Sequence, residues 1–107
     1  MSLDVTLTAI RETEVYDANI THNLGGMADA AGIYEYLWRP EEVNVTKAEQ
    51  LIKPLTRGLD KLKSDPDYYK QYDSPNGCGI YEHFVPFVEK YLQACIDNPD
   101  AEVSVWR

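Results

Sequence analysis

The segment Asp17–Gly26, which reads DANITHNLGG, gathers polar side chains in a pattern that suits acid–base chemistry. His22 is the side chain able to carry a proton near neutral pH, and Asp17, Asn19 or Asn23 would orient its ring. A helix that begins at Asn19 would add free backbone N–H groups, which attract anions. The segment therefore predicts a polar pocket for a small molecule or for a hydrolase-like reaction.

The same segment also has a purely structural interpretation. Asn19 and Thr21 would cap the helix, and His22 would donate one hydrogen bond to a neighbouring loop, which is the more common role of such residues. Gly25 and Gly26 would each cost about 1 kcal/mol relative to alanine inside a helix. We therefore expect another backbone or a ligand to approach closely there. Both interpretations stay open at this point.

A second segment, Ser74–Gly79, reads SPNGCG and precedes Tyr81 and His83. Cys78 at a helix start could act as a nucleophile with His83 as its base. An Asn-Gly turn that only connects two helices is the alternative, and no third group to orient the histidine is evident. Asn76 and Tyr81 join the candidate polar site if this loop lies beside His22.

No catalytic residue is assigned, and no metal or cofactor is expected. The two histidines are not spaced as a helical ligand pair, and the two cysteines form no thiolate motif. Neither a phosphate-gripping loop nor a nucleophile elbow occurs.

The elements that would position these residues follow from hydrophobic periodicity. Residues Leu3–Ile10 and Glu102–Arg107 alternate apolar and polar side chains, which predicts two strands, and we expect them to pair antiparallel. Apolar spacing predicts a helix from Asn19 to Gly32, a further turn before Pro40, a helix from a Thr46/Glu49 capping box to Lys63, a turn at Asp65–Pro66, and a helix at Ile80–Ile96. Pro54 and Pro86 are placed on the solvent faces of their helices.

The expected fold is therefore α+β and mainly helical: about three main helices packed on a two-stranded sheet of the N- and C-terminal strands. The chain has 107 residues and a net charge of −8, which suits one domain over residues 1–107. The acid excess argues against direct nucleic-acid binding. No apolar run or leader pattern indicates a membrane or an export signal, so a cytoplasmic location is expected. The bases gather at residues 47–63, which hold five bases and two acids.

Four segments carry a resemblance to a group of small proteins encoded in bacterial, phage and mobile-element genomes. They are Asn19–Gly25, Ala31–Tyr34, Leu37–Glu42 and Asn76–Glu82. A tryptophan is common in that group where this chain has Cys78, which weakens the cysteine-nucleophile hypothesis. No activity is assigned to the group, so the resemblance implies a self-contained domain and no reaction.

The absence of a catalytic constellation, together with eight tyrosines and divided charge, favours a non-enzymatic binding module. Its partner would be another protein, and a homodimer is also expected. The alternative is the small-molecule or hydrolase-like site on Asp17, Asn19, His22 and Asn23, extended by Asn76 and Tyr81. A second alternative is an acidic mimic of nucleic acid, which would need carboxylates in rows along one face.

Overall fold

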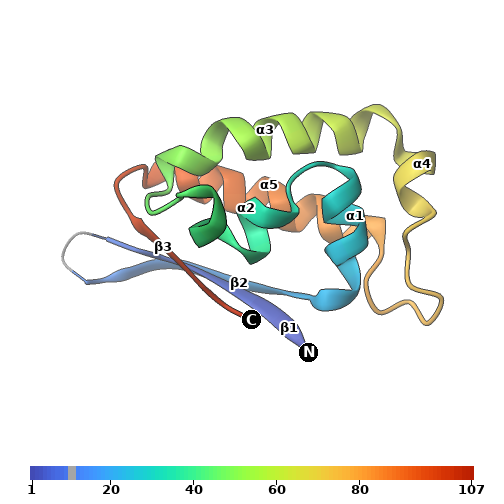
Figure 1. Ribbon diagram of the computed structural model, residues 1–107, viewed down its shortest axis with the longest axis horizontal. Coiled ribbons are helices and arrows are strands. Elements are labelled where there is room, and N and C mark those ends of the chain that lie inside the picture. Colours follow the sequence, from blue (N-terminus) through green and yellow to red (C-terminus); the bar gives the residue numbers. More distant parts are fainter. Residues whose placement is uncertain (10–11) are drawn as a thin grey trace.

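A three-stranded antiparallel sheet carries the helices on one of its faces (Figure 1). The computed structural model describes residues 1–9 and 12–107. The strands, in the spatial order β2-β1-β3, are β1 (Ser2–Thr8), β2 (Glu14–Thr21) and β3 (Glu102–Trp106).

Five α-helices and two short 3₁₀ helices make up the rest of the described fold. They are η1 (His22–Leu24), α1 (Gly25–Ala30), α2 (Tyr34–Trp38), η2 (Pro40–Val43), α3 (Glu49–Ser64), α4 (Pro66–Lys70) and α5 (Tyr81–Asp97). Among the described residues, no helix has both the length and the apolar character needed to cross a bilayer.

The central strand β1 follows the predicted alternation. Leu3, Val5 and Leu7 are completely buried beneath the helices, while the residues between them point away from the helical layer. The predicted antiparallel pairing with the C-terminal strand is confirmed, with Val5 opposite Val105. The predicted first strand is confirmed from Leu3 to Thr8, and its last residue, Ile10, lies outside the described residues.

The prediction of a helix beginning at Asn19 was wrong. Residues 14–21 form β2, with Asn19 paired to Asp4 of β1, so the sheet has three strands rather than two. The side chains of Tyr16, Ala18 and Ile20 alternate toward the core, and the register with β1 outweighs the helical spacing of Ile20 with later residues. Helical structure starts only at His22, and Gly32 ends this region with a left-handed φ of 78°, as expected.

The two long helices lie close to their predicted positions, with two corrections at α3. The helix begins at Glu49, and the side chain of Gln50 accepts from the amides of Thr46 and Lys47, so the Thr46/Glu49 capping box does not form. Pro54 is buried against the core, whereas the solvent-side placement of Pro86 in α5 is confirmed. The missing N–H of Pro54 therefore falls within the packed face of α3.

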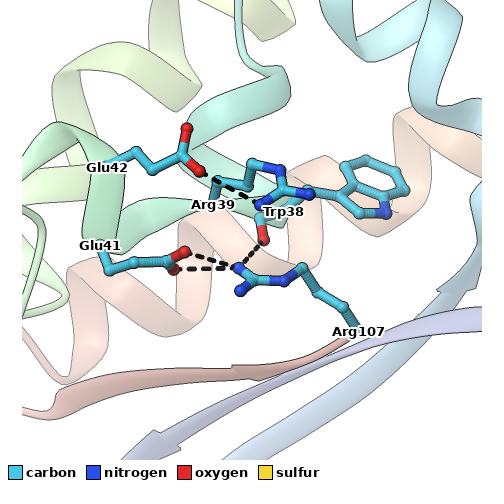
Figure 2. A network of polar contacts seen from close by, with 5 residues as sticks. All are labelled: Trp38, Arg39, Glu41, Glu42 and Arg107. Atoms are coloured by element: carbon cyan, nitrogen blue, oxygen red, sulfur yellow. Dashed lines mark hydrogen bonds and ion pairs between the residues drawn. The ribbon is translucent and has the colours of Figure 1, made fainter.

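The C-terminal residue joins the sheet to the helical layer. The Nη1 atom of Arg107 donates to the Trp38 carbonyl at 2.7 Å and to both Glu41 carboxylate oxygens at 3.0 and 2.8 Å (Figure 2). A backbone N–H at Glu41 and the Arg107 guanidinium lower the pKa of this carboxyl. The charge of Arg107 is thus directed to the helix side of the sheet.

Tyr91 of α5 is fully buried, and its hydroxyl has no hydrogen-bond partner among the described residues. Tyr91→Phe is therefore expected to leave the free energy of unfolding unchanged or to raise it by about 1 kcal/mol, because a buried unpaired hydroxyl is removed without loss of ring packing. Denaturant unfolding measures this. Tyr16→Phe is the control, since Tyr16 stacks on Tyr91 but is only half-buried. A loss of stability in Tyr91→Phe alone would contradict the prediction.

Candidate functional site

His22 lies in η1, where its imidazole is a packing partner of Trp38. The Nε1–H of Trp38 donates to Nδ1 of His22 at 2.7 Å, and Trp38 stacks on Tyr34 with ring centroids 5.3 Å apart. Because Nδ1 accepts this bond, the neutral ring carries its proton on Nε2. His22 therefore serves as the acceptor for a buried indole of α2. The role is structural, but it differs from the predicted donation to a neighbouring loop.

His22→Ala should lower the free energy of unfolding by about 1–3 kcal/mol, because Trp38 is only 2% exposed and would keep an unpaired N–H. His22→Gln retains an acceptor and should recover part of the loss. Chemical denaturation of the three proteins provides the comparison. Equal stability of His22→Ala and the wild type would show that this hydrogen bond contributes nothing.

The His22 segment and the Ser74–Gly79 loop do meet in the structure. Nδ2 of Asn23 donates to the Cys78 carbonyl at 2.7 Å. An alanine Cβ at Gly79 would stand 2.9 Å from Cγ2 of Thr21 and 3.0 Å from Cβ of Asn23. The contact is a packed junction of two chain segments, and the side-chain N–H donor of Asn23 is engaged in it.

The remaining polar candidates of the loop are also engaged within the fold. Oδ1 of Asn76 accepts from the Ser74 hydroxyl and from the Cys78 amide. The Tyr81 hydroxyl donates to the Leu62 carbonyl at 2.8 Å, which ties the start of α5 to the end of α3. Asn76 shapes the turn, and Tyr81 joins two helices.

Cys78 and His83 do not form the sketched nucleophile and base. Cys78 is exposed in the loop, α5 begins only at Tyr81, and no hydrogen bond joins Cys78 to His83 in the described part of the chain. The other thiol, Cys95, is buried, and burial raises its pKa to about 12. The described geometry therefore gives no support to Cys78 and His83 as a nucleophile and its base.

The two glycines at the start of α1 lie beneath aromatic rings. A Cβ would meet Tyr34 at 3.4 Å from Gly25 and Tyr72 at 3.6 Å from Gly26, which are ordinary packing distances. Side chains rather than another backbone therefore lie against these two glycines.

Asp17 and Asn19 are separated from the other candidates because their side chains lie on the face of the sheet that is turned away from the helices. Both are exposed on β2, where Asn19 pairs with Asp4 and Asp17 pairs with Thr6. None of the six candidate residues lines any of three hollows on the described surface, those lined by Val15 and Ala101, by Glu41 and Val103, and by Tyr16 and Lys90. The six side chains thus do not converge on one concave site.

The face of the sheet turned away from the helices gathers polar and acidic side chains from all three strands. We call it the acidic sheet face; it comprises Asp4, Thr6 and Thr8 of β1, Glu14, Asp17 and Asn19 of β2, and Glu102, Ser104 and Trp106 of β3. None of the described strand residues is lysine or arginine. Trp106 is 77% exposed and lies in register with Asp4. Lys47, whose backbone forms an isolated β-bridge with that of Glu102, places a base at the margin of this face.

This face was not predicted from the sequence, although part of the signal was present. Tyr16, Ala18 and Ile20 alternate with polar residues, which is the period of a half-buried strand. With that strand assigned, the carboxylates of the three strands would have been placed on one side by their parity.

The described residues bring together no group of three His, Cys, Asp or Glu side chains that could hold a metal ion. Comparison of the chain with protein-family models, with curated proteins and with solved structures gave no match.

Proposed function

We propose that the protein is a non-catalytic binding module whose acidic sheet face binds a basic surface of another protein. The observation that carries the proposal is a sheet face with four carboxylates, an exposed tryptophan and no described element over it (Figure 1). Potentials of opposite sign across an interface steer association and select the partner.

The arrangement of side chains on this face supports contact with a protein rather than simple solvation. Trp106 gives an exposed ring beside Asp4, and a tryptophan next to a carboxylate suits a lysine or arginine through cation–π and ionic contact. The total charge of −8 would also attract a basic partner from a distance. The strands hold the face rigidly, because β1 is paired on both sides.

The structure gives the small-molecule alternative less support. Its six residues are divided between the acidic sheet face, the Trp38 contact and the Ser74–Gly79 loop. We therefore place the binding activity on the sheet.

A selection from random peptides tests the proposal, because it can be carried out before any partner has been identified. Immobilised wild-type protein is expected to enrich peptides rich in lysine and arginine. The variant Glu14→Lys/Asp17→Lys should bind the enriched peptides at least about tenfold more weakly at low salt, because the charge is reversed at two exposed positions of the face.

Asp60→Lys/Asp67→Lys is the matched control, with the same change in charge on exposed positions in the last turns of α3 and in α4, away from the strands (Figure 1). It should retain most of the binding. Equal losses of affinity in both variants would show that binding depends on net charge alone. Enrichment of acidic or uncharged peptides would contradict the proposal.

The nucleic-acid mimic is a special case that the same face would serve, because its carboxylates lie along three adjacent strands. In that case the basic partner is itself a nucleic-acid-binding protein. Competition between duplex DNA and this protein for such a partner distinguishes it from other basic proteins.

A further inference from the structure

The outer edge of β2 has no neighbouring strand in the described fold, in contrast to the edge of β3. The β3 edge is partly covered, because Val103 N donates to the Thr46 carbonyl and Ala48 N donates to the Ala101 carbonyl. No described backbone group bonds to the outer side of β2. An uncovered edge of this kind is a template for another strand.

The register shows which backbone groups of β2 are free. His22 N donates to the Met1 carbonyl, so the neighbouring pair Thr21–Ser2 is a non-hydrogen-bonded pair. Alternation along the ladder then directs the N–H and C=O of Ala18 toward β1 and those of Asp17 and Asn19 toward the free edge. Two residues, Asp17 and Asn19, thus present donor and acceptor groups at strand spacing.

A shallow groove runs beside this edge, between β2 and the C-terminal half of α5. One hollow of about 300 Å³ is lined by Val15 and Tyr16 of β2 and by Lys90, Gln93, Ala94, Asp97 and Asn98. A second hollow of about 450 Å³ shares Val15, Asp97 and Asn98 with it. Val15 is 39% exposed there, so an apolar side chain entering the groove would cover apolar surface.

We propose that β2 accepts an extended basic peptide as a fourth strand, with its backbone on Asp17 and Asn19. Alternate side chains of the added strand would lie toward the groove beside α5 and toward the acidic sheet face. The first set is apolar and the second is lysine or arginine. This inference rests on the proposed function and specifies the form of the partner.

The charges around the edge select a basic peptide rather than a second copy of the chain. Glu14, Asp17 and Asp97 are exposed around it, and Lys90 is the one described base among the groove residues. A second copy would bring a further charge of −8 to the same place. Like charges oppose that association, whereas a lysine-bearing strand is attracted.

A capped peptide of alternating lysine and valine, titrated against the full chain at low salt, tests the inference. Its two N-methylated forms, one methylated at the lysine amides and the other at the valine amides, keep the charge and side chains but each lose the donors of one edge. We expect one form to bind at least about tenfold more weakly and the other to bind like the parent. An antiparallel strand would be sensitive to methylation at the lysines, which share the outer face with Asp17.

Amide exchange and a variant pair give independent measurements of the same contact. On binding of the parent peptide, the amides of Asp17 and Asn19 should become protected while that of Ala18 is unchanged. Asn19→Pro removes an outward N–H and should weaken binding, whereas Asn19→Ala keeps the amide and should not. If Asn19→Pro does not fold, the N-methylated peptides still test the inference on the wild-type protein.

The outcomes separate the two proposals. Equal binding of both N-methylated forms would overturn strand addition and leave the acidic sheet face as the binding surface. No binding by any lysine-bearing peptide would overturn both proposals. A dimer in light scattering that Asn19→Pro dissociates would assign the edge to a second copy and overturn the peptide as its occupant.

Discussion

Gly79→Ala is expected to destabilise the protein by about 3 kcal/mol, which would lower the melting temperature by roughly 12 °C or more. Gly79 has a φ of 110°, a conformation that side-chain-bearing residues rarely adopt. The added Cβ would also stand 2.9 Å from Thr21 and 3.0 Å from Asn23. The substitution therefore strains the backbone and separates the loop from the end of β2, and thermal unfolding measures both effects together.

Gly77→Ala separates the two contributions, because Gly77 also has a positive φ, 77°, but a Cβ there would meet nothing within 4 Å. It should cost only about 1 kcal/mol, from the backbone conformation alone. Equal losses for the two variants would show that the contact of Gly79 with Thr21 and Asn23 does not contribute.

Gly58→Ala should lower the free energy of unfolding by about 2 kcal/mol, although alanine is the better helix former. Gly58 lies on the buried face of α3, and an added Cβ would overlap Cγ2 of Ile33. Ile33 is 1% exposed, so its side chain has little space in which to move. Denaturant titration of the variant measures the loss.

A double-mutant cycle with Ile33→Ala tests whether this overlap is the cause. Ile33→Ala alone leaves a cavity and should cost about 2–5 kcal/mol. In the double variant, the new methyl group occupies part of that cavity, so the Gly58→Ala loss should disappear. Additive losses would contradict the assigned contact and point to a different effect of the methyl group on α3.

The residues of the predicted polar site lie in separate parts of the fold, which local sequence patterns could not predict. The sequence could not show whether the residues around His22 meet the Ser74–Gly79 loop, because the contact joins residues 55 positions apart. No local pattern indicates that Asn23 donates to the Cys78 carbonyl or that Trp38 donates to His22. These bonds exist because the tertiary fold brings α2 and the Ser74–Gly79 loop beside η1.

Local patterns, in contrast, were sufficient for several elements. Alternation predicted β1 and β3, and a long apolar stripe predicted α3 and α5. Asp65 followed by Pro66 predicted the start of α4, where the Asp65 carboxylate accepts from the Tyr68 amide. Each of these signals depends on residues that are close together in the chain, so each can be identified from the sequence alone.

The sequence by itself thus determined an α+β chain with terminal strands paired antiparallel and an acid excess of −8. Only the tertiary structure decided that Asp17–Thr21 belongs to a strand. Its residues fit both a helical and a strand period, and pairing with β1 selected the strand. Because of that pairing, Asp17 and Asn19 lie on the acidic sheet face rather than in the predicted pocket, and their backbone groups lie at a free edge. The two strands follow one another in the chain, but the helical and strand periods compete within Asp17–Thr21, and packing of both strands against the helices decides between them.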